Sequence, residues 1–413
     1  MTPTILLIGT ADTKSDELLF LRERITAAGG EVLLMDVGVL EPGRCVPDIH
    51  NDAVATAAGT TLDAVKEAGD ENRAMTIMAR GASMLAAQLH ADGRIDGMLA
   101  LGGTMGTDLA LDVAEALPLG VPKVVLSTIA YSHLIPPERI APDLMMALWA
   151  GGLYGLNSLC RSSLAQAAGA VVGACRSASA PQRERPLVGM TSLGSSALRY
   201  MRRLKPALEA RGYELAVFHT TGMGGRAFES IASQGGFVAV MDFSLQEVAN
   251  HVAGSCVTAG SDRLLGAGRA GVPQIVAPGA VDMVDFQAWQ SVPEGYAGRP
   301  QHAHNRLIAS ASTPASMRRE VARGIGARLA QAIGPTCLLL PRRGIEEWDR
   351  PGQALHDPEG LDAFVDEMRA CTPANVRLIE LDTHINDDAF ADAALEVFDA
   401  WVSVGRVVAG LRT

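Results

Sequence analysis

The chain alternates between short apolar runs and longer amphipathic segments from its first residues onward. Residues 5–8 form a continuous apolar run that ends at Gly9, a pattern typical of a strand buried on both faces of a parallel sheet. The segment 15–28 then places leucine and isoleucine at helical spacing and stops at two glycines. A second apolar run at 31–36 completes a βαβ unit, which predicts two parallel strands joined by a right-handed crossover.

The same alternation continues through two halves that are separated by a polar linker at 176–186. In the first half it predicts helices at 72–89 and 108–116, strands at 97–101 and 123–126, an irregular region at 41–60 and buried helices within 144–173. In the second half it predicts strands at 237–241, 274–277, 337–340 and 376–381 and helices at 315–333, 361–370 and 389–408.

The second half also repeats sequence motifs of the first half. LVGMTSLGSS after the linker resembles LLIGTADTKS near the N-terminus, and AGVPQIVAPG resembles LGVPKVVLST. These matches could also arise because any two βαβ units resemble each other in sequence, which is the competing explanation. We predict two Rossmann-like, doubly wound α/β domains with mainly parallel sheets, at residues 1–178 and 187–413.

Composition narrows the classes of protein that fit. The formal net charge is −11 and no run of Lys or Arg is long enough to form a groove for a polyanion, so nucleic-acid binding is disfavoured. No stretch reaches the ~18 apolar residues that a membrane-spanning helix needs. The N-terminus lacks the basic region of a signal peptide. The six cysteines show no C-x-x-C spacing, which argues against a zinc ribbon. We therefore expect a cytoplasmic protein with reduced thiols.

Small and hydroxyl-bearing residues follow the predicted strands of the first half. Such turns let a phosphate approach the backbone amides, and a helix N-terminus behind them adds a partial positive charge. Because the carboxyl ends of parallel strands meet at one edge of a sheet, we expect these loops to surround one nucleotide. The candidate nucleotide-binding residues are Gly9, Thr10, Asp12, Thr13 and Lys14 after the first strand, Asp36 after the second, Gly102, Gly103, Thr104, Gly106 and Thr107 after the third, and Ser127 and Thr128 after the fourth.

Each of these residues has a structural alternative. Lys14 would pair with a phosphate, Asp36 with ribose hydroxyls, and Asp12 with the ribose or with Mg²⁺ carried by ATP. The loops match neither G-x-x-x-x-G-K-[ST] nor G-x-G-x-x-G. An ordinary βα turn in which Asp12 or Ser15 caps the helix is the competing interpretation, and Asp36 is equally well explained as a strand-end aspartate.

The second half carries a mixture of side chains suited to acid–base chemistry. Residues 222–226 (GMGGR) resemble an anion-binding nest in which Arg226 would supply a guanidinium group. The catalytic candidates are Arg226, Glu229, Asp282 and His304, although each alone is more often structural than catalytic. His302 and His304 are two residues apart and no cysteine accompanies them, so no dedicated zinc site is expected.

Several ordered motifs resemble a known family. They are GTADTK, GGTMGT, LST, TTGMGGRAFE, AGSDRLLGAGRAGVPQIVAPGAVDMV and the His-Asn pair at 304–305. Together they are similar to the Tm-1-like ATP-binding family, which includes the N-terminal half of a plant tomato mosaic virus resistance protein. The resemblance runs over nearly the whole chain and implies two Rossmann-like domains, ATP binding and a homodimer. The plant protein's binding of a viral replication protein is not carried over, because this chain is expected to lack that protein's separate C-terminal domain.

Three functions follow as alternatives. The first is ATP-dependent chemistry on a small metabolite in a cleft between the domains. The second is a non-catalytic module whose binding is regulated by nucleotide, which the missing Walker lysine signature favours. The third is an isomerase or lyase that acts on a phosphorylated sugar acid without ATP, the glycine turns holding the substrate's phosphate. Because α/β sheets host many chemistries, the fold does not decide among them.

Overall fold

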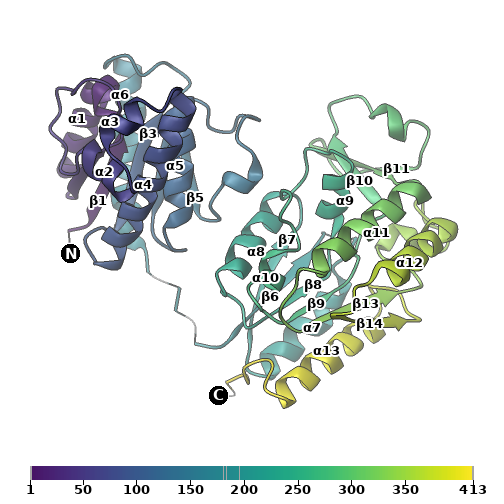
Figure 1. Ribbon diagram of the computed structural model, residues 1–413. Coiled ribbons are helices and arrows are strands. Elements are labelled where there is room, and N and C mark those ends of the chain that lie inside the picture. The colour runs from purple at the N-terminus through teal and green to yellow at the C-terminus, as the bar shows by residue number, and fades with distance from the viewer. Residues whose placement is uncertain (1, 180, 183, 195, 412–413) are drawn as a thin grey trace. The chain divides into compact units, whose positions relative to one another are not determined.

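The protein divides into two compact units (Figure 1). The structure, a computed structural model, describes residues 2–179, 181–182, 184–194 and 196–411. One unit spans Met1–Gln182 and the other Arg183–Thr413, and we call them the N-terminal and C-terminal domains. The predicted linker at 176–186 therefore contains the point at which one unit ends and the next begins.

The N-terminal domain is built on a five-stranded parallel sheet with the order β2-β1-β3-β4-β5. Both faces of the sheet are covered, which is why its apolar runs are continuous: Ile5 and Leu7 pack on one face of β1, and Leu6 and Ile8 pack on the other. The strands are β1 (Thr4–Gly9), β2 (Glu31–Asp36), β3 (Gly97–Gly102), β4 (Lys123–Ser127) and β5 (Leu144–Leu148).

Two pairs of long helices cover this sheet. One face packs against α1 (Ala11–Ala27) and α6 (Ser158–Ser177), and the other against α4 (Glu71–Ala91) and α5 (Thr104–Ala116). The short helices α2 (Asn51–Ala57) and α3 (Leu62–Lys66) pack beside α4, so the region expected to be irregular contains a helix.

The expectation of buried helices throughout 144–173 is wrong in its first part. Residues 144–148 form the edge strand β5, and α6 begins only at Ser158. Met145 and Leu148 are largely exposed on this strand. Low charge and high Met and Leu content are common to buried helices and edge strands, and this short run shows no period that separates them.

The C-terminal domain has a six-stranded parallel sheet with the order β14-β13-β9-β8-β6-β7. Its strands are β6 (Leu187–Ser192), β7 (Glu214–His219), β8 (Ala239–Asp242), β9 (Gln274–Val276), β13 (Thr336–Pro341) and β14 (Val376–Leu381). In both domains the first strand lies between the second and the third, so the repeated sequences occupy equivalent strands: β1 matches β6, and β4 matches β9.

Helices again cover both faces of this sheet. One face packs against α7 (Arg199–Ala210) and α13 (Asp388–Ser403). The other packs against α8 (Met223–Ser233), α9 (Gln246–Val252), α10 (Gly266–Arg269), α11 (Ala315–Leu329) and α12 (Pro358–Cys371). Two α/β domains with mainly parallel sheets confirm the predicted fold class.

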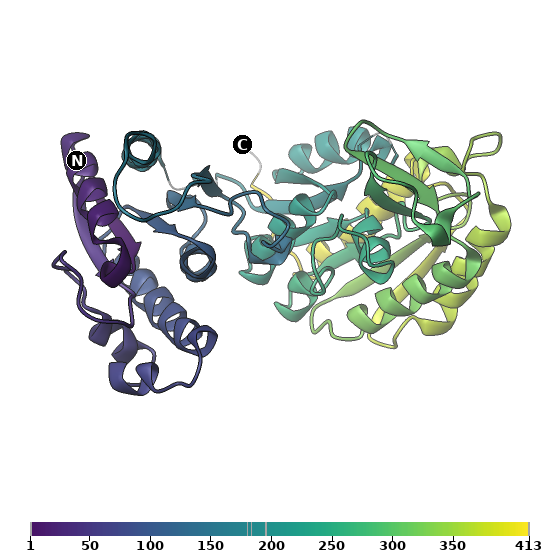
Figure 2. The ribbon, with the colours of Figure 1, turned by 90° about the horizontal axis from the view of Figure 1, so that it is seen from above.

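A small antiparallel sheet interrupts the C-terminal domain between β9 and α11, and the sequence pattern did not predict it. Its strands are β10 (Met283–Gln287), β11 (Gln301–Ala303) and β12 (Ile308–Ser312), in the order β10-β12-β11. Figures 1 and 2 show it at one end of the C-terminal domain, and β10 packs against α9. Within the described residues, no helix is both long and apolar enough to cross a membrane.

Candidate functional site

The first candidate site lies at the carboxyl edge of the N-terminal sheet, where β1, β3 and β4 end side by side. A parallel sheet of this strand order changes winding direction between β1 and β3, and ligands of such sheets bind at that switch point. The loops singled out from the sequence therefore leave the sheet at the expected place. The structure also shows which of their side chains remain open to a ligand and which are used internally.

Asp36 is used internally. One oxygen of its carboxylate, Oδ1, accepts the backbone N–H of Ala11 at 2.9 Å and that of Gly38 at 2.8 Å. Burial raises the pKa of Asp36, while these two amide hydrogen bonds oppose the rise. Ala11 is the first residue of α1, so Asp36 satisfies one of the helix's free N-terminal amides. This arrangement supports the structural interpretation of Asp36 over ribose binding.

The residues that were predicted to form the loop after β1 are divided between strand and helix: Gly9 ends β1, Thr10 precedes α1, and residues 12–14 lie in the first turn of α1. Asp12 accepts the backbone N–H of Leu40 on Oδ2 at 2.9 Å, whereas its Oδ1 is buried without a hydrogen-bond partner among the described residues. Thr10 and Thr13 share a hydroxyl–hydroxyl bond of 2.8 Å. The ammonium group of Lys14 lies 5.1 Å from the centre of the Tyr154 ring, a cation–π contact.

The turn after β3 is shorter than the sequence suggested, because α5 begins at Thr104. Thr104, Gly106 and Thr107 thus belong to the first helical turn. Gly102 ends β3, and the connection between strand and helix is Gly103 alone. No side chain of the described residues caps α5 at Gly103. A Cβ atom on Gly102 would lie 2.5 Å from the Gly106 Cα, so the tight turn requires glycine there.

The end of β4 supplies one buried and one partly exposed hydroxyl. Ser127 is buried; it shares a 2.7 Å hydrogen bond with Thr107 and accepts the Ile129 N–H at 3.0 Å. Thr128 lies beside the α5 N-terminus: its N–H donates to the Gly102 carbonyl at 3.2 Å, and a Cβ built on Gly103 would lie 3.8 Å from its hydroxyl oxygen. The buried hydrogen bond between Thr107 and Ser127 therefore holds the start of α5 against the end of β4. The residues at this edge that remain partly or fully exposed are Gly103, Thr104 and Thr128.

In the C-terminal domain, the glycine nest after β7 is already filled. The N–H groups of Gly222 and Gly225 donate to Glu247 at 2.6 and 3.2 Å, and a Cβ on Gly225 would collide with that carboxylate. Glu247 thus occupies the position expected for an external anion. Arg226, the predicted guanidinium donor, forms an ion pair of 2.6 Å with Asp262.

Arg263 pairs with the buried carboxylates behind this nest, and no local sequence signal predicts this role. It is fully buried and contacts three carboxylates: Asp242 through two bonds of 2.5 and 2.7 Å, Glu229 at 2.9 Å and Glu247 at 2.7 Å. Burial raises the pKa of Glu247 to about 7, although Arg263 pulls it down. Glu229 additionally accepts two backbone amides, a setting that favours a structural role for this catalytic candidate.

Asp282 lies in a second buried carboxyl cluster. It is 1 % exposed, and it lies within electrostatic range of Glu346, which is 0 % exposed. Each carboxyl has one oxygen, Asp282 Oδ1 and Glu346 Oε1, with no hydrogen-bond partner in the described part of the chain. Burial raises the pKa of both groups, and the charge of Asp282 raises that of Glu346 further.

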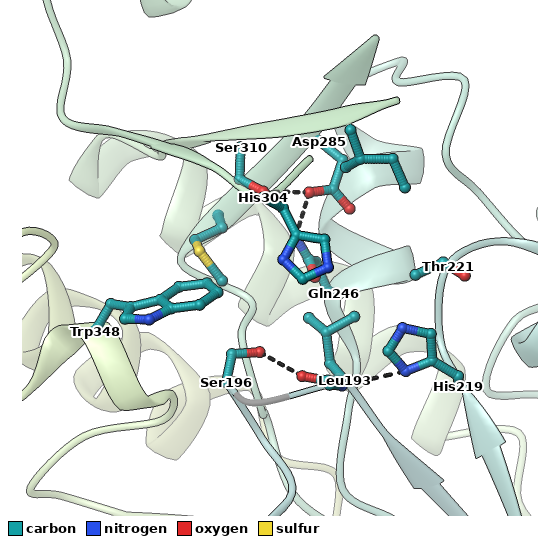
Figure 3. A pocket seen from close by; sticks show the side chains of 12 residues that line it. Leu193, Ser196, His219, Thr221, Gln246, Asp285, His304, Ser310 and Trp348 are labelled. Carbon is teal, nitrogen blue, oxygen red and sulfur yellow. Dashed lines mark hydrogen bonds between the residues drawn. The ribbon is translucent and has the colours of Figure 1, made fainter. Parts of the chain in front are cut away.

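The fourth candidate, His304, faces a cavity between the parallel sheet and the small antiparallel sheet (Figure 3). Opposite it stands His219, the last residue of β7, whose ring the sequence analysis did not single out. The cavity has a volume of about 30 Å³. It is lined by Leu193, Gly194, Ser196, His219, Thr221, Gln246, Met283, Asp285, His304, Ile308, Ser310 and Trp348.

Asp285 is the buried anchor of this cavity. Its carboxylate accepts hydrogen bonds from Gln246 at 2.8 Å, Ser310 at 2.5 Å and Asn250 at 3.1 Å. Burial raises the pKa of Asp285, and these three donors and His304 counteract the rise. On the apolar side, the indole of Trp348 stacks on the ring of His302, with centroids 3.6 Å apart.

Comparison with known proteins identifies the family. A model described as the uncharacterised protein family (UPF0261) N-terminal domain matches residues 3–180, and the C-terminal domain of the same family matches residues 185–402. The chain belongs to the UPF0261 family. A UPF0261 protein of Brucella melitensis is 58 % identical over 409 residues, covering 99 % of this chain and 98 % of that protein. One from Clostridium tetani is 33 % identical, with 95 % and 97 % covered.

The resemblance stated from the motifs is confirmed as well. The tomato ToMV resistance protein Tm-1(GCR237) is 29 % identical over 423 residues, covering 96 % of this UPF0261 chain and 55 % of the tomato protein. Among solved structures, a thioesterase domain from the curacin biosynthetic pathway matches 54 % of this chain and 93 % of its own, with 13 % identity and a TM-score of 0.25. That likeness carries no argument about fold or function.

Proposed function

We propose that the N-terminal domain binds ATP through its phosphates at the carboxyl edge of the sheet. The observation that carries the proposal is the open N-terminus of α5: it starts directly after Gly102-Gly103, no described side chain caps it, and it stands at the switch point of the sheet. Uncapped helix amides and the helix dipole together form an anion site, and glycine lets a phosphate approach them.

Side chains around this helix end supply the remaining groups that such a ligand needs. The Thr128 hydroxyl lies beside Gly103, and the Thr10–Thr13 pair follows the neighbouring strand. Lys14 makes a weak cation–π contact and pairs with no carboxylate of the residues that the structure describes, so its ammonium group remains available for a phosphate.

Magnesium would enter this site with the nucleotide. Among the described residues, no group of three or more His, Cys, Asp or Glu side chains is arranged to hold a metal ion. Mg²⁺ often takes one or two carboxylates and completes its shell with phosphate oxygens and water. The unpartnered Oδ1 of Asp12 fits that requirement, and Asp12 is therefore the residue that would hold it.

The family resemblance supports the nucleotide and extends the proposal to a homodimer in the cytoplasm. All six cysteines are free thiols, a state that a reducing compartment maintains. Chemistry on a small metabolite would use the bound ATP; regulated binding without turnover is the alternative that uses the same site.

Titration calorimetry with ATP and Mg²⁺ tests the proposal. A charged contact from Lys14 is worth about 1.5–3 kcal/mol, so Lys14→Met should weaken ATP binding by roughly 10- to 150-fold. Lys66→Met is the matched control, because Lys66 is exposed at the end of α3, and it should leave the affinity unchanged. An unaltered affinity in Lys14→Met removes Lys14 from the site, and wild-type protein that takes up no ATP overturns the proposal itself.

A further inference from the structure

The cavity of the C-terminal domain combines groups that no part of the ATP proposal uses. Two imidazoles, His219 and His304, line it together with the buried carboxylate of Asp285. Figure 3 shows Trp348 and His219 on opposite sides of the cavity, with His304 in front of Asp285. The three groups come from three segments that are distant in sequence, and the fold brings them to one hollow.

The hydrogen bonding of His219 fixes which of its ring nitrogens carries the proton. Its Nδ1 accepts the backbone N–H of Gly194 at 3.1 Å, and a nitrogen that accepts an N–H bond cannot itself hold a proton. The neutral ring must therefore carry its hydrogen on Nε2. Partial burial and the neighbouring His304 lower the pKa of His219, and the smaller effect of Asp285 opposes them, so the net shift favours the neutral ring. His219 is consequently a fixed N–H donor.

The surroundings of His304 suit the opposite role. Asp285 lies within electrostatic range, and its three side-chain donors hold the negative charge in place. A fixed carboxylate nearby favours the imidazolium that forms when a histidine accepts a proton. A neutral imidazole donor opposite a base is the pair that removes a proton from carbon next to a carbonyl group.

The size of the cavity limits the ligand. Its volume is about 30 Å³. One water requires roughly 10–15 Å³, so the space holds about two or three water-sized groups. Met283, Ile308 and Trp348 provide apolar contacts on its walls. The carbonyl group and the carbon next to it, at the reactive end of a small compound, fit this volume.

We propose that this cavity is an acid–base site that enolises a small carbonyl compound, with His304 as the base and the Nε2–H of His219 as the donor to the carbonyl oxygen. The C–H bond next to the carbonyl breaks, and its proton moves to His304. Its electron pair forms the C=C bond of the enolate while the carbonyl electrons move to the oxygen beside His219. Return of the proton to the same carbon exchanges hydrogen. Where that carbon bears a hydroxyl, as in dihydroxyacetone, the hydroxyl proton passes to the oxygen beside His219 and the proton on His304 goes to the former carbonyl carbon, which isomerises the compound; neither outcome consumes an oxidant or reductant.

Proton NMR in D₂O, in the absence of ATP, tests this assignment with pyruvate and dihydroxyacetone as probes. The wild-type protein should replace the hydrogens next to the carbonyl of at least one probe by deuterium, at a rate that saturates with probe concentration. General-base catalysis contributes about 10²–10⁴-fold, so His304→Gln should slow the exchange at least 100-fold. His219→Gln should slow it less, because it removes one hydrogen bond. His133→Gln, in an exposed loop of the N-terminal domain, should not change it.

Three results would overturn the proposal. The first is equal exchange by the wild type and the double variant His219→Gln/His304→Gln with both probes. The second is an equal loss in His133→Gln. The third needs no variant: nitrogen NMR of the wild-type imidazoles should show His219 protonated on Nε2, and a proton on Nδ1 contradicts the donor role. Because no ATP is present, failure of this exchange leaves the nucleotide proposal standing, and failure of ATP binding leaves the enolisation proposal standing.

Discussion

The two domains share one strand order but treat the carboxyl edge of the sheet differently. In the N-terminal domain the helix after β3 begins without a cap, beside glycine and threonine. In the C-terminal domain the two nest amides of the glycine-rich turn are bound by Glu247, which in turn pairs with Arg263. The N-terminal domain thus leaves a helix end open after its third strand, whereas the C-terminal domain fills the glycine-rich turn after its second strand with its own carboxylate. A glycine-rich turn alone does not show whether its anion comes from outside or from within.

One pair of equivalent residues shows how a single side chain changes the chemistry of this edge. Asp36 ends the second strand of the first domain, and His219 ends the second strand of the other. Both side chains accept a backbone N–H from the turn after the first strand, from Ala11 and from Gly194 respectively. An aspartate satisfies the turn and leaves no donor, whereas a histidine satisfies it with one nitrogen and presents an N–H on the other. The position is structural in one domain and available for a ligand in the other.

The largest effect should come from removing the internal cation of the C-terminal domain. Arg263→Met leaves three buried carboxylates without their partner, and breaking a buried pair in this way costs about 3–5 kcal/mol. Calorimetric unfolding should show the C-terminal domain destabilised by that amount and the N-terminal domain unaffected. Arg406→Met, at an exposed arginine, serves as the control and should stay within about 0.5 kcal/mol. A loss below about 1 kcal/mol in Arg263→Met would mean that the cluster does not support the domain.

A smaller effect should follow from the buried pair Asp282 and Glu346. An unfolded glutamate ionises near pH ~4.3, whereas burial keeps Glu346 protonated to higher pH. Between the pKa of the unfolded glutamate and the raised pKa of Glu346, the folded state therefore binds more protons than the unfolded state. The free energy of unfolding falls as the pH rises through this range. Glu346→Gln does not titrate and removes the repulsion between two buried carboxylates, so it should stabilise the C-terminal domain at pH 8 by at least about 1 kcal/mol.

Urea unfolding at pH 5 and pH 8 measures this difference. The gain from Glu346→Gln should be small at pH 5 and larger at pH 8, while Glu396→Gln on the exposed side of α13 should show no such trend. A gain that shrinks with rising pH would show that Glu346 is already ionised in the folded protein, which is the opposite of what its burial predicts.

Local sequence predicted the parts of the molecule that depend on local signals. The strands around Ile5–Ile8 and Val376–Leu381 and the long helices α1, α4 and α11 follow from continuous apolar runs, helical spacing and glycine punctuation. The small antiparallel sheet was missed because its strands are short and pair across a long connection. The filling of the glycine nest was missed because Glu247 comes from another element, 22 residues beyond Gly225.

The cavity residues illustrate the same limit. His304 was singled out as one member of a polar cluster, but its partners Asp285 and His219 are defined by the fold and not by spacing. His219 could have been found, since it ends a strand at the edge where ligands bind and the same rule selected Asp36. Trp348 carries no such signal, because only the return of the chain after β13 brings it to the cavity.

Hydrogen–deuterium exchange with and without ATP and Mg²⁺ tests most directly whether the two sheet edges differ as described. ATP should slow the exchange of the amides at 104–106, where the N-terminus of α5 is open. It should leave Gly222 and Gly225 unchanged, since Glu247 already holds those two amides. Slower exchange at Gly222 and Gly225 with none at 104–106, or no change in either turn, would contradict the account.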